Sequence, residues 1–259
     1  MTDIAIVTGG AGGLGRLLTM ELARAGSHVV VADHDVTAGP RVVDEVAAAG
    51  GRATFIETDA SDAPQIHRMV DRAGTLGRVA VLINNAGGWL PGPQFPDTDN
   101  WRRALDLNLA MPMLATQLCL PLMAAAGGGA VVNVSSSGGW DSGAYGSPEY
   151  AAAKAGLVRF TTAVRDFAPR FGVRVSCVVP HWIGLDRAVQ EYEQLDTERR
   201  LASGGLVDPA TVVRTIMELT QDPESAGKVV VLRADRDPYP VDPAGYDPVA
   251  RSASPNGCG

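Results

Sequence analysis

Short apolar runs alternate with segments of helical periodicity along most of this chain of 259 residues. Most of the runs are continuously apolar, which is typical of strands that are covered on both faces of a parallel sheet. The runs that we expect to be strands are Ile4–Thr8, His28–Asp33, Ala53–Thr58, Val79–Asn84, Ala130–Ser135, Val173–Val179 and Lys228–Leu232. The segments that we expect to be helices are Leu14–Ala25, Val36–Ala49, Ala63–Gly74, Trp101–Ala126, Tyr150–Phe171 and Pro209–Leu219.

Repetition of strand, helix and strand predicts right-handed crossovers. We therefore expect an α/β fold: a single-domain, doubly wound Rossmann fold with a seven-stranded parallel sheet and helices on both faces. The domain should span residues 1–235, because no Gly/Ser-rich linker divides the chain. Residues 183–205 are polar and helical, and we expect a substrate lid there. Residues 236–259 are rich in Pro, Gly and Asp and predict an irregular C-terminal tail.

Composition excludes several classes of protein. A net charge of -7 argues against nucleic acid or an anionic membrane as the main partner. Three cysteines without a CxxC pair disfavour a disulfide scaffold or a zinc site, so we expect no metal and a reducing, cytoplasmic location. The first residues carry no basic stretch typical of a signal peptide. The uncharged stretch Leu107–Trp140 is interrupted by Pro, Gly and Asn, and predicts a buried helix and a central strand rather than a membrane span.

A glycine-rich turn follows the first expected strand and leads directly into a helix, with the sequence Thr8-Gly-Gly-Ala-Gly-Gly-Leu-Gly15. Glycine lets the backbone approach a pyrophosphate, and the free N–H groups and dipole of the helix favour negative charge. Asp33 ends the second strand 18 residues after Gly15, near the spacing at which a carboxylate accepts hydrogen bonds from an adenosine ribose. Such a carboxylate repels a 2′-phosphate, so we expect NAD(H) over NADP(H), although Arg16 could weaken this discrimination. The alternatives are a turn without a ligand and an aspartate that only caps the loop.

Two further strand ends carry polar or small residues. Asp59-Ala60 follows the third strand, where a carboxylate and a backbone N–H can bind an adenine edge, although Asp59 could equally cap the next helix. Asn84-Asn85-Ala86-Gly87 follows the fourth strand, where small residues let the chain pass close to a cofactor. An ordinary turn explains that segment as well.

Tyr150 and Lys154 stand four residues apart at the start of an expected helix, so both lie on one helix face. A nearby cation favours the phenolate and makes a tyrosine usable as an acid or base near neutrality. Only two of the 22 basic residues are lysines, and this invites a chemical reason for Lys154. Such a pair is otherwise a common feature of helices. Upstream, Ser135-Ser136-Ser137 ends the fifth strand, where open α/β sheets bind ligands, and no Gly-x-Ser-x-Gly motif predicts a nucleophilic serine.

With these motifs in this order, the sequence resembles the short-chain dehydrogenase/reductase family over about residues 3–233. The resemblance implies hydride transfer between a nicotinamide and an alcohol or carbonyl carbon. It implies that Tyr150 moves the hydroxyl proton and that Lys154 binds the nicotinamide ribose. Ser136 would bind the substrate oxygen, with Ser137 as the near competitor, and Asn108 would hold a water in a proton relay. The implied NAD contacts are Gly9, Gly13, Leu14, Gly15, Asp33, Asp59, Ala60, Asn85, Ala86, Gly87, Tyr150, Lys154, Pro180 and Ile183.

The sequence departs from this family after the sixth strand and at its end. In Pro180-His181-Trp182-Ile183-Gly184-Leu185, a histidine replaces the usual glycine and a leucine replaces the usual threonine. The nicotinamide end of the cofactor would then be held differently, and His181 becomes a candidate substrate contact, although a lone histidine is more often structural. The usual closing Asp-Gly-Gly run is replaced by Leu232-Arg233-Ala234-Asp235.

Aromatic residues on the loops expected above the cofactor predict an apolar pocket. They are Trp89, Trp140, Tyr145 and Trp182. We expect a small-molecule substrate, a secondary alcohol or ketone that is lipophilic or contains a ring; alternatively, these rings pack the lid or a subunit contact. The competing functions are an NAD(P)H-dependent biosynthetic ketoreductase and a catalytically silent NAD-binding protein. The resemblance also implies a homodimer or homotetramer, in which the apolar, small-residue faces of Trp101–Ala126 and Tyr150–Phe171 would pair across a two-fold axis.

Overall fold

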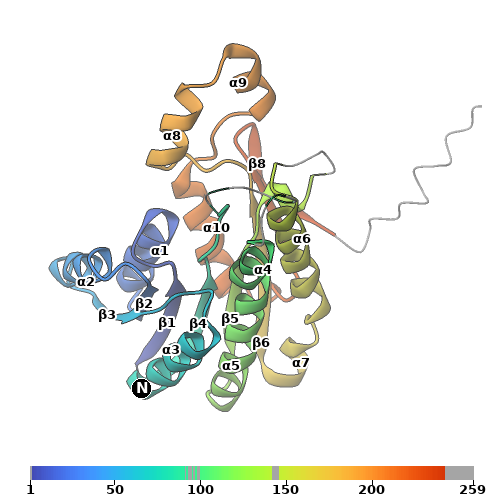
Figure 1. The fold of residues 1–259 in the computed structure, drawn as a ribbon. Helices are drawn as coiled ribbons and strands as arrows, with labels where there is room; N and C mark the ends of the chain where they lie inside the picture. Colours follow the sequence, from blue (N-terminus) through green and yellow to red (C-terminus); the bar gives the residue numbers. More distant parts are fainter. Residues whose placement is uncertain are drawn as a thin grey trace, which may run out of the picture.

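The computed structural model describes residues 2–90, 92, 95, 97, 100–141 and 146–242. These residues form an eight-stranded sheet with the order β3-β2-β1-β4-β5-β6-β7-β8, and helices cover both of its faces (Figure 1). The strands are β1 (Asp3–Thr8), β2 (His28–Asp33), β3 (Arg52–Glu57), β4 (Arg78–Asn84), β5 (Gly129–Val134), β6 (Val173–Pro180), β7 (Val229–Arg233) and β8 (Arg236–Val241). The strands β1 to β7 pair in parallel. The expected doubly wound α/β fold is confirmed.

The helices form a layer on each side of the sheet (Figure 1). One layer holds α1 (Gly13–Arg24), α2 (Ala38–Ala48) and α10 (Pro209–Gln221). The other holds α3 (Ala63–Leu76), α4 (Trp101–Leu105), α5 (Met111–Ala125), α6 (Pro148–Ala163) and α7 (Phe167–Phe171). The chain order reverses between β1 and β4, and an open α/β sheet binds its ligands beyond the carboxyl ends of the strands at such a point.

The prediction of a seven-stranded, wholly parallel sheet was wrong in one respect, because the sheet has an eighth strand, β8, which is antiparallel. β8 lies within the segment expected to be irregular, and it pairs antiparallel with β7 through a two-residue turn. Tyr239 and Val241 pack against the buried Val229 and Val231, and this apolar contact explains why the strand forms. Two prolines alternate with these residues, and proline is tolerated on the edge of a sheet. Residues 243–259 lie outside the described part of the chain.

Two of the expected long helices differ in detail. Trp101–Ala125 is one helix that contains a π-helical turn at Asp106–Ala110, whereas Tyr150–Phe171 is divided into α6 and α7. Trp101–Ala125 is long and apolar enough to cross a membrane by length and composition alone. In this fold it packs against α3 and β4, and β5 follows it in the middle of the sheet, as expected.

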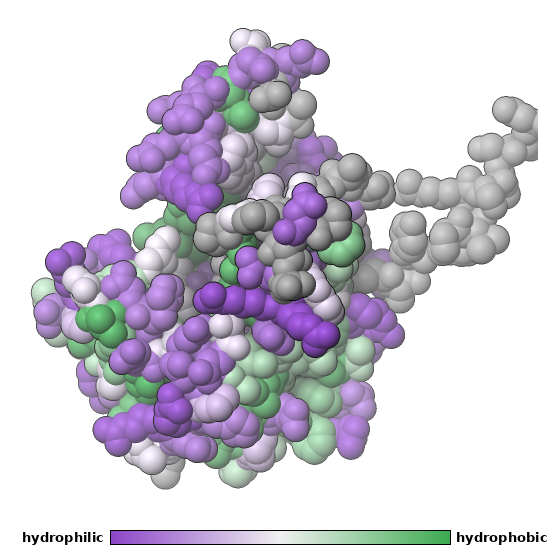
Figure 2. Space-filling view, in the orientation of Figure 1, coloured by the Kyte–Doolittle hydropathy of each residue, from purple (hydrophilic) through white to green (hydrophobic). Residues whose placement is uncertain are grey.

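The segment expected to be a lid forms α8 (Asp186–Glu193) and α9 (Thr197–Ser203) above the carboxyl edge of the sheet (Figure 1). A parallel bridge between Ile183 and Val207 closes its base. On the face seen in Figure 2, hydrophilic side chains predominate over this segment. Its role as a lid stays a prediction.

Candidate active site

Two loops at the carboxyl edge of the sheet are tied together by hydrogen bonds. The Thr8 hydroxyl accepts from the backbone N–H groups of Asn85 and Ala86, at 3.0 Å each. The Asn85 side-chain amide donates to the carbonyl oxygens of Thr8 at 2.9 Å and Gly9 at 3.2 Å. These bonds fix the glycine-rich turn beside the loop that follows β4. The hydrogen bonds between the Thr8 hydroxyl and the loop after β4 were not predicted from the sequence. A hydroxyl residue at the end of an apolar strand is the feature that could have indicated them.

The glycine-rich turn has the shape of a pyrophosphate site. Gly9 and Gly13 have φ angles of 65° and 48°, which favour glycine. A Cβ added to Gly15 would lie 1.9 Å from the Gly9 carbonyl oxygen, so α1 and the turn are too close for a side chain. The N-cap residue of α1, Gly12, has no side chain to cap the helix, so the first N–H groups of α1 are suited to bind phosphate oxygens. The predicted contacts of Gly9, Gly13, Leu14 and Gly15 fit this geometry.

Asp33 ends β2 and faces the glycine-rich turn, with an exposed fraction of 8%. Its carboxylate accepts from the Ala11 N–H at 3.0 Å and from the Asp35 N–H at 3.1 Å. These bonds fix the side chain beside the turn, where its remaining lone pairs can accept from a ribose. Arg16 is directed to α2, where it binds Glu45 at 2.7 Å.

The predicted adenine contact at Asp59 lies in a turn of its own. The Asp59 carboxylate accepts from the backbone N–H and hydroxyl of Ser61, and these bonds hold its pKa below the ordinary value. Asp62, not Asp59, caps α3 by accepting from Gln65 N–H at 3.1 Å. Ala60 and Ala86 line a small cavity whose other walls come from the ends of β1 and β4, from α3, and from the π-helical turn and α5. Their cofactor contacts stay predictions.

Tyr150 and Lys154 lie together on α6, as their spacing predicts. The Lys154 ammonium lies 5.6 Å from the centre of the Tyr150 ring and donates to the Val134 carbonyl at 2.9 Å. Lys154 is buried, with an exposed fraction of 3%. Burial lowers its pKa to about 8, and the nearby Cys177 acts in the opposite direction. A buried ammonium is costly to keep, which points to a chemical role.

Asn108 reaches the same site from the π-helical turn. Its side-chain amide donates to the carbonyls of Gly88 and Ala104, and its oxygen accepts from the Gly88 N–H at 2.9 Å. A Cβ added to Gly87 would lie 2.7 Å from Asn108 Oδ1 and 3.0 Å from Lys154 Nζ. Gly87 therefore passes between these two side chains, which explains the need for a small residue there. π-helical turns occur frequently at functional sites.

The serine run divides into a structural and an accessible part. The Ser135 hydroxyl is buried and donates to the Lys154 carbonyl at 2.8 Å, which ties β5 to α6. The Ser136 hydroxyl is half-buried and accepts from the Gly138 N–H at 3.2 Å, so its own hydrogen can turn toward a ligand. Ser137 begins a short 3-10 turn. The choice of Ser136 over Ser137 stays a prediction.

A buried polar chain supports this edge from below, and sequence reasoning missed it. The Asn84 amide donates to Asn133 Oδ1 at 2.8 Å, and the Asn133 amide donates to the Thr161 hydroxyl at 2.9 Å. The chain links β4, β5 and α6, which carry the loop after β4, the serine run and Tyr150. An asparagine inside the apolar run Val131–Val134 is the signal that would have found it.

The predicted substrate contacts do not form one cluster. Trp89 is 50% exposed, and its ring lies 3.0 Å from a Cβ added to Gly146, just before α6. Trp140 instead packs against the buried Val158 and Val179 and neighbouring residues. The Trp182 ring meets that of Tyr192 edge-on at 6.0 Å, within the lid. Tyr145 lies outside the described residues.

The residues after β6 that differ from the family pattern lie in two different parts of the site. Leu185 touches the glycine-rich turn, because a Cβ on Gly13 would lie 3.4 Å from it. Pro180 ends β6, and Ile183 pairs with Val207 at the base of the lid. His181 is half-buried, and burial lowers its pKa.

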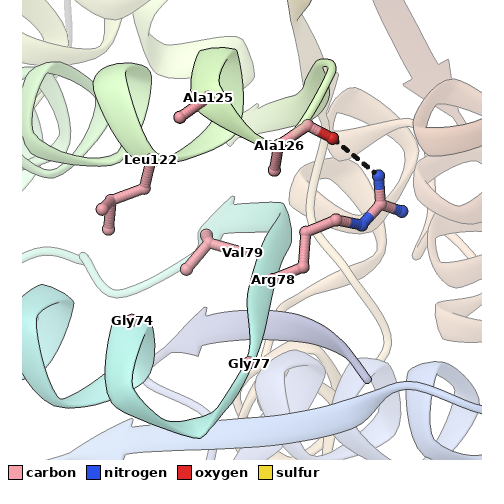
Figure 3. A pocket seen from close by; sticks show the side chains of 7 residues that line it. All are labelled: Gly74, Gly77, Arg78, Val79, Leu122, Ala125 and Ala126. Atoms are coloured by element: carbon pink, nitrogen blue, oxygen red, sulfur yellow. Dashed lines mark hydrogen bonds between the residues drawn. The ribbon is translucent and has the colours of Figure 1, made fainter. Parts of the chain in front are cut away.

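A second hollow lies away from these groups, between α3, the amino end of β4 and the end of α5 (Figure 3). It is lined by Gly74, Gly77, Arg78, Val79, Leu122, Ala125 and Ala126. Arg78 is bound to Asp3 at 2.7 Å and donates to the Ala126 carbonyl. The lining holds no acid–base pair, so the candidate active site remains at the carboxyl edge.

We predict that Lys154→Met stabilises the fold at pH 7 by about 2 kcal/mol, after the lost hydrogen bond to Val134 is counted. The folded pKa of about 8 lies below the ordinary value of 10.5, so burial of the ammonium destabilises the fold fully below pH 8. Above pH 8 the folded protein has lost this proton, whereas the unfolded chain keeps it up to about pH 10.5. The destabilisation of the fold, on the order of 3 kcal/mol below pH 8, therefore disappears between these two pH values.

Urea unfolding of both proteins from pH 6 to 10 measures this difference. Burial raises the pKa of the Cys119 and Cys177 thiols to about 12, so both stay protonated in the two folded proteins over this range, and their ionisation in the unfolded chain is common to both. Lys228→Met is the matched control, because Lys228 forms a partly exposed ion pair with Asp222, and its effect should be small and flat. A Lys154→Met variant that is less stable at every pH would contradict the prediction.

Comparison with known proteins extends these observations. The sequence model of the short chain dehydrogenase family matches residues 3–196. Cyclohexanol dehydrogenase of Acinetobacter sp. (strain SE19) is 31% identical over 226 residues, which are 86% of this chain and 89% of that protein. Cis-4-hydroxycyclohexanecarboxylate dehydrogenase of Sinomonas cyclohexanicum is 34% identical over 245 residues, 90% of this chain and 94% of that protein.

A solved structure of similar fold is 7α-hydroxysteroid dehydrogenase with NADH and 7-oxo glycochenodeoxycholic acid. It superposes with a TM-score of 0.78 at 27% identity, and the match covers 91% of this chain and 94% of that one. The doubly wound sheet agrees with these matches. This chain is therefore an oxidoreductase that belongs to the short-chain dehydrogenase/reductase family, whose members bind nicotinamide cofactors.

Proposed function

We propose that this protein is an NAD-dependent oxidoreductase that transfers a hydride between NAD(H) and a secondary alcohol or ketone, lipophilic or ring-containing. The observation that carries the proposal is the buried Lys154 beside Tyr150. The ammonium could bind a cofactor ribose in a catalytically silent protein as well, but its place beside the phenol stabilises the phenolate, which only acid–base chemistry needs. The site lies at the carboxyl edge of the sheet, next to a turn that suits a pyrophosphate.

In this mechanism the nicotinamide, when bound, supplies or accepts the hydride. The glycine-rich turn holds the pyrophosphate and Asp33 holds the adenosine ribose. Ser136 binds the substrate oxygen, and Tyr150 moves the proton between this oxygen and the phenol. The charge on Lys154 stabilises the phenolate, and Asn108 positions a water that exchanges the proton with solvent.

NAD preference is tested by Asp33→Ser. The change removes the carboxylate that accepts from the ribose hydroxyls, so we expect NADH binding to weaken about 10- to 100-fold and the preference over NADPH to shrink. Fluorescence titration with both cofactors measures this. Asp44→Ser, which removes the same charge from an exposed position on α2, should change neither affinity. Unchanged NADH binding by Asp33→Ser would show that Asp33 only shapes the turn, and a wild-type preference for NADPH would favour a biosynthetic ketoreductase.

The substrate class has two supports. Trp89 presents an exposed ring beside the loop that precedes Tyr150. The relatives named cyclohexanol dehydrogenase and 7α-hydroxysteroid dehydrogenase are named for ring alcohols. A panel of alicyclic, aromatic and small polar alcohols tests the class, and faster oxidation of the small polar alcohols would overturn it. We also propose a cytoplasmic location. A homodimer or homotetramer is proposed because Met113 and Leu122 on α5 are exposed and could pack against another subunit.

A further inference from the structure

Arg233 and His181 lie side by side at the carboxyl edge of the sheet. β6 pairs with β7 through Pro180 and Leu232, so the residues that follow these two remain in register. The His181 N–H donates to the Leu232 carbonyl at 2.9 Å, which extends the ladder by one residue. Arg233 Nη1 lies 3.5 Å from His181 Nε2. The pair thus stands on the two strands that follow β5, whose end carries Ser136.

The same register places Arg233 at a definite distance from the reacting centre. β5 pairs with β6 through Val134 and Val178, so Ser136 lies level with Pro180. Neighbouring strands are about 4.8 Å apart, so the backbone of Arg233 lies about 10 Å from that of Ser136. A saturated ring that carries a polar group at each end, bound beyond the carboxyl edge of the sheet, can span this backbone separation.

The positive charge of the Arg233 guanidinium is only partly neutralised, and some of its N–H donors are not used by the described residues. Its Nε donates to Asp235 at 3.0 Å, and Arg236 donates to the same carboxylate, so two guanidinium groups share one carboxylate. Because burial lowers the pKa of His181, the neutral ring can accept from Nη1 and hold the guanidinium. A Cβ on Gly204, directly after α9, would lie 3.5 Å from Nη2, so this atom faces the end of the lid. Nη2 makes no hydrogen bond within the described part of the chain.

We propose that Arg233 binds a carboxylate on the substrate, with His181 as a positioning residue that holds the guanidinium. One N–H on Nη1 and two on Nη2 remain for a bidentate contact, which suits the planar carboxylate. Asp141, the other carboxylate that acts on His181, lies on the exposed loop after β5. The inference rests on the proposed function and narrows it to ring alcohols or ketones that carry a carboxylate remote from the reacting carbon.

Calorimetric titration with cyclohexanecarboxylate and its neutral analogue, cyclohexanecarboxamide, tests the site without turnover, in the presence of NADH. We expect the wild-type protein to bind the carboxylate about 10- to 100-fold more tightly than the amide. Arg233→Gln should abolish this preference, and His181→Leu should reduce it, both without changing amide affinity. Arg236→Gln is the matched control, because it removes the other guanidinium from the same Asp235 and should keep the preference.

Turnover of 4-hydroxycyclohexanecarboxylate and its amide separates this inference from the proposed function. Arg233→Gln should raise KM for the acid alone and leave kcat unchanged. Equal wild-type binding of acid and amide, or an equal loss for both in Arg233→Gln, would overturn the carboxylate site. If the ring alcohols are oxidised without preference for the acid, only the carboxylate site fails. If the carboxylate binds through Arg233 but no ring alcohol reacts, the proposed function fails and the site stands.

Discussion

Tyr150→Phe is expected to lower turnover about 10²- to 10⁴-fold while NADH affinity is retained. The change removes the hydroxyl that we propose moves the proton, and a positioned acid or base contributes a factor of this size. The Tyr150 ring and its contact with Lys154 remain, so the fold of α6 should not change. Initial rates of NAD⁺ reduction and a fluorescence titration with NADH measure the two effects on the same preparation.

Tyr239→Phe is the matched control for this experiment. Tyr239 lies on β8 and packs near the buried Val231, so loss of its hydroxyl should leave turnover within about twofold of the wild type. If Tyr150→Phe keeps more than about a tenth of the turnover, another group moves the proton. His181, which directly follows β6, is then the first candidate.

Gly15→Ala is expected to damage both folding and cofactor binding. The added Cβ would lie 1.9 Å from the Gly9 carbonyl oxygen and 2.7 Å from the Asn85 amide, so α1 must move away from the turn. Overpacking of this kind destabilises by about 1–3 kcal/mol, and a displaced turn should weaken NADH binding at least about 100-fold. Urea unfolding and NADH titration measure the two losses.

Gly12→Ala separates this packing effect from the general effect of a glycine substitution in the same turn. Gly12 has an extended backbone, with φ of -143°, and an added Cβ would meet nothing within 4 Å. Its free energy of unfolding should therefore lie within about 0.5 kcal/mol of the wild type. Equal stability of the two variants would show that the close approach at Gly15 does not hold the turn.

The fold could be read from the sequence because buried parallel strands leave continuous apolar runs, and because helices between them leave a second period. The Tyr150 and Lys154 pair was predictable for the same reason, since i,i+4 spacing determines a shared helix face. The edge strand β8 was not, because its apolar face consists of only Tyr239 and Val241 between prolines. A run this short and rich in proline looks like an irregular tail.

Other parts of the site depend on contacts between distant segments. The π-helical turn that carries Asn108 could not be predicted from the spacing of apolar residues. It adds one residue to a turn of the helix, and the direction of its side chains depends on the elements that pack around it. Trp140 was expected to line a pocket, and in the structure one side of it packs against the buried cluster that contains Val158 of α6. An aromatic residue on a loop fits either place, and only packing decides. The pairing of His181 with Arg233 likewise requires the strand order of β6 and β7.

The most direct test of the proposed activity is a coupled product measurement with NAD⁺ and cyclohexanol. The proposal predicts that the wild-type protein forms NADH and cyclohexanone in equal amounts, faster with NAD⁺ than with NADP⁺, and that Tyr150→Phe forms neither at a comparable rate. The reverse reaction, cyclohexanone with NADH, should consume both in equal amounts. Tight binding of NADH without turnover of any ring alcohol or ketone, in either direction, would contradict the proposal and identify a silent NAD-binding protein.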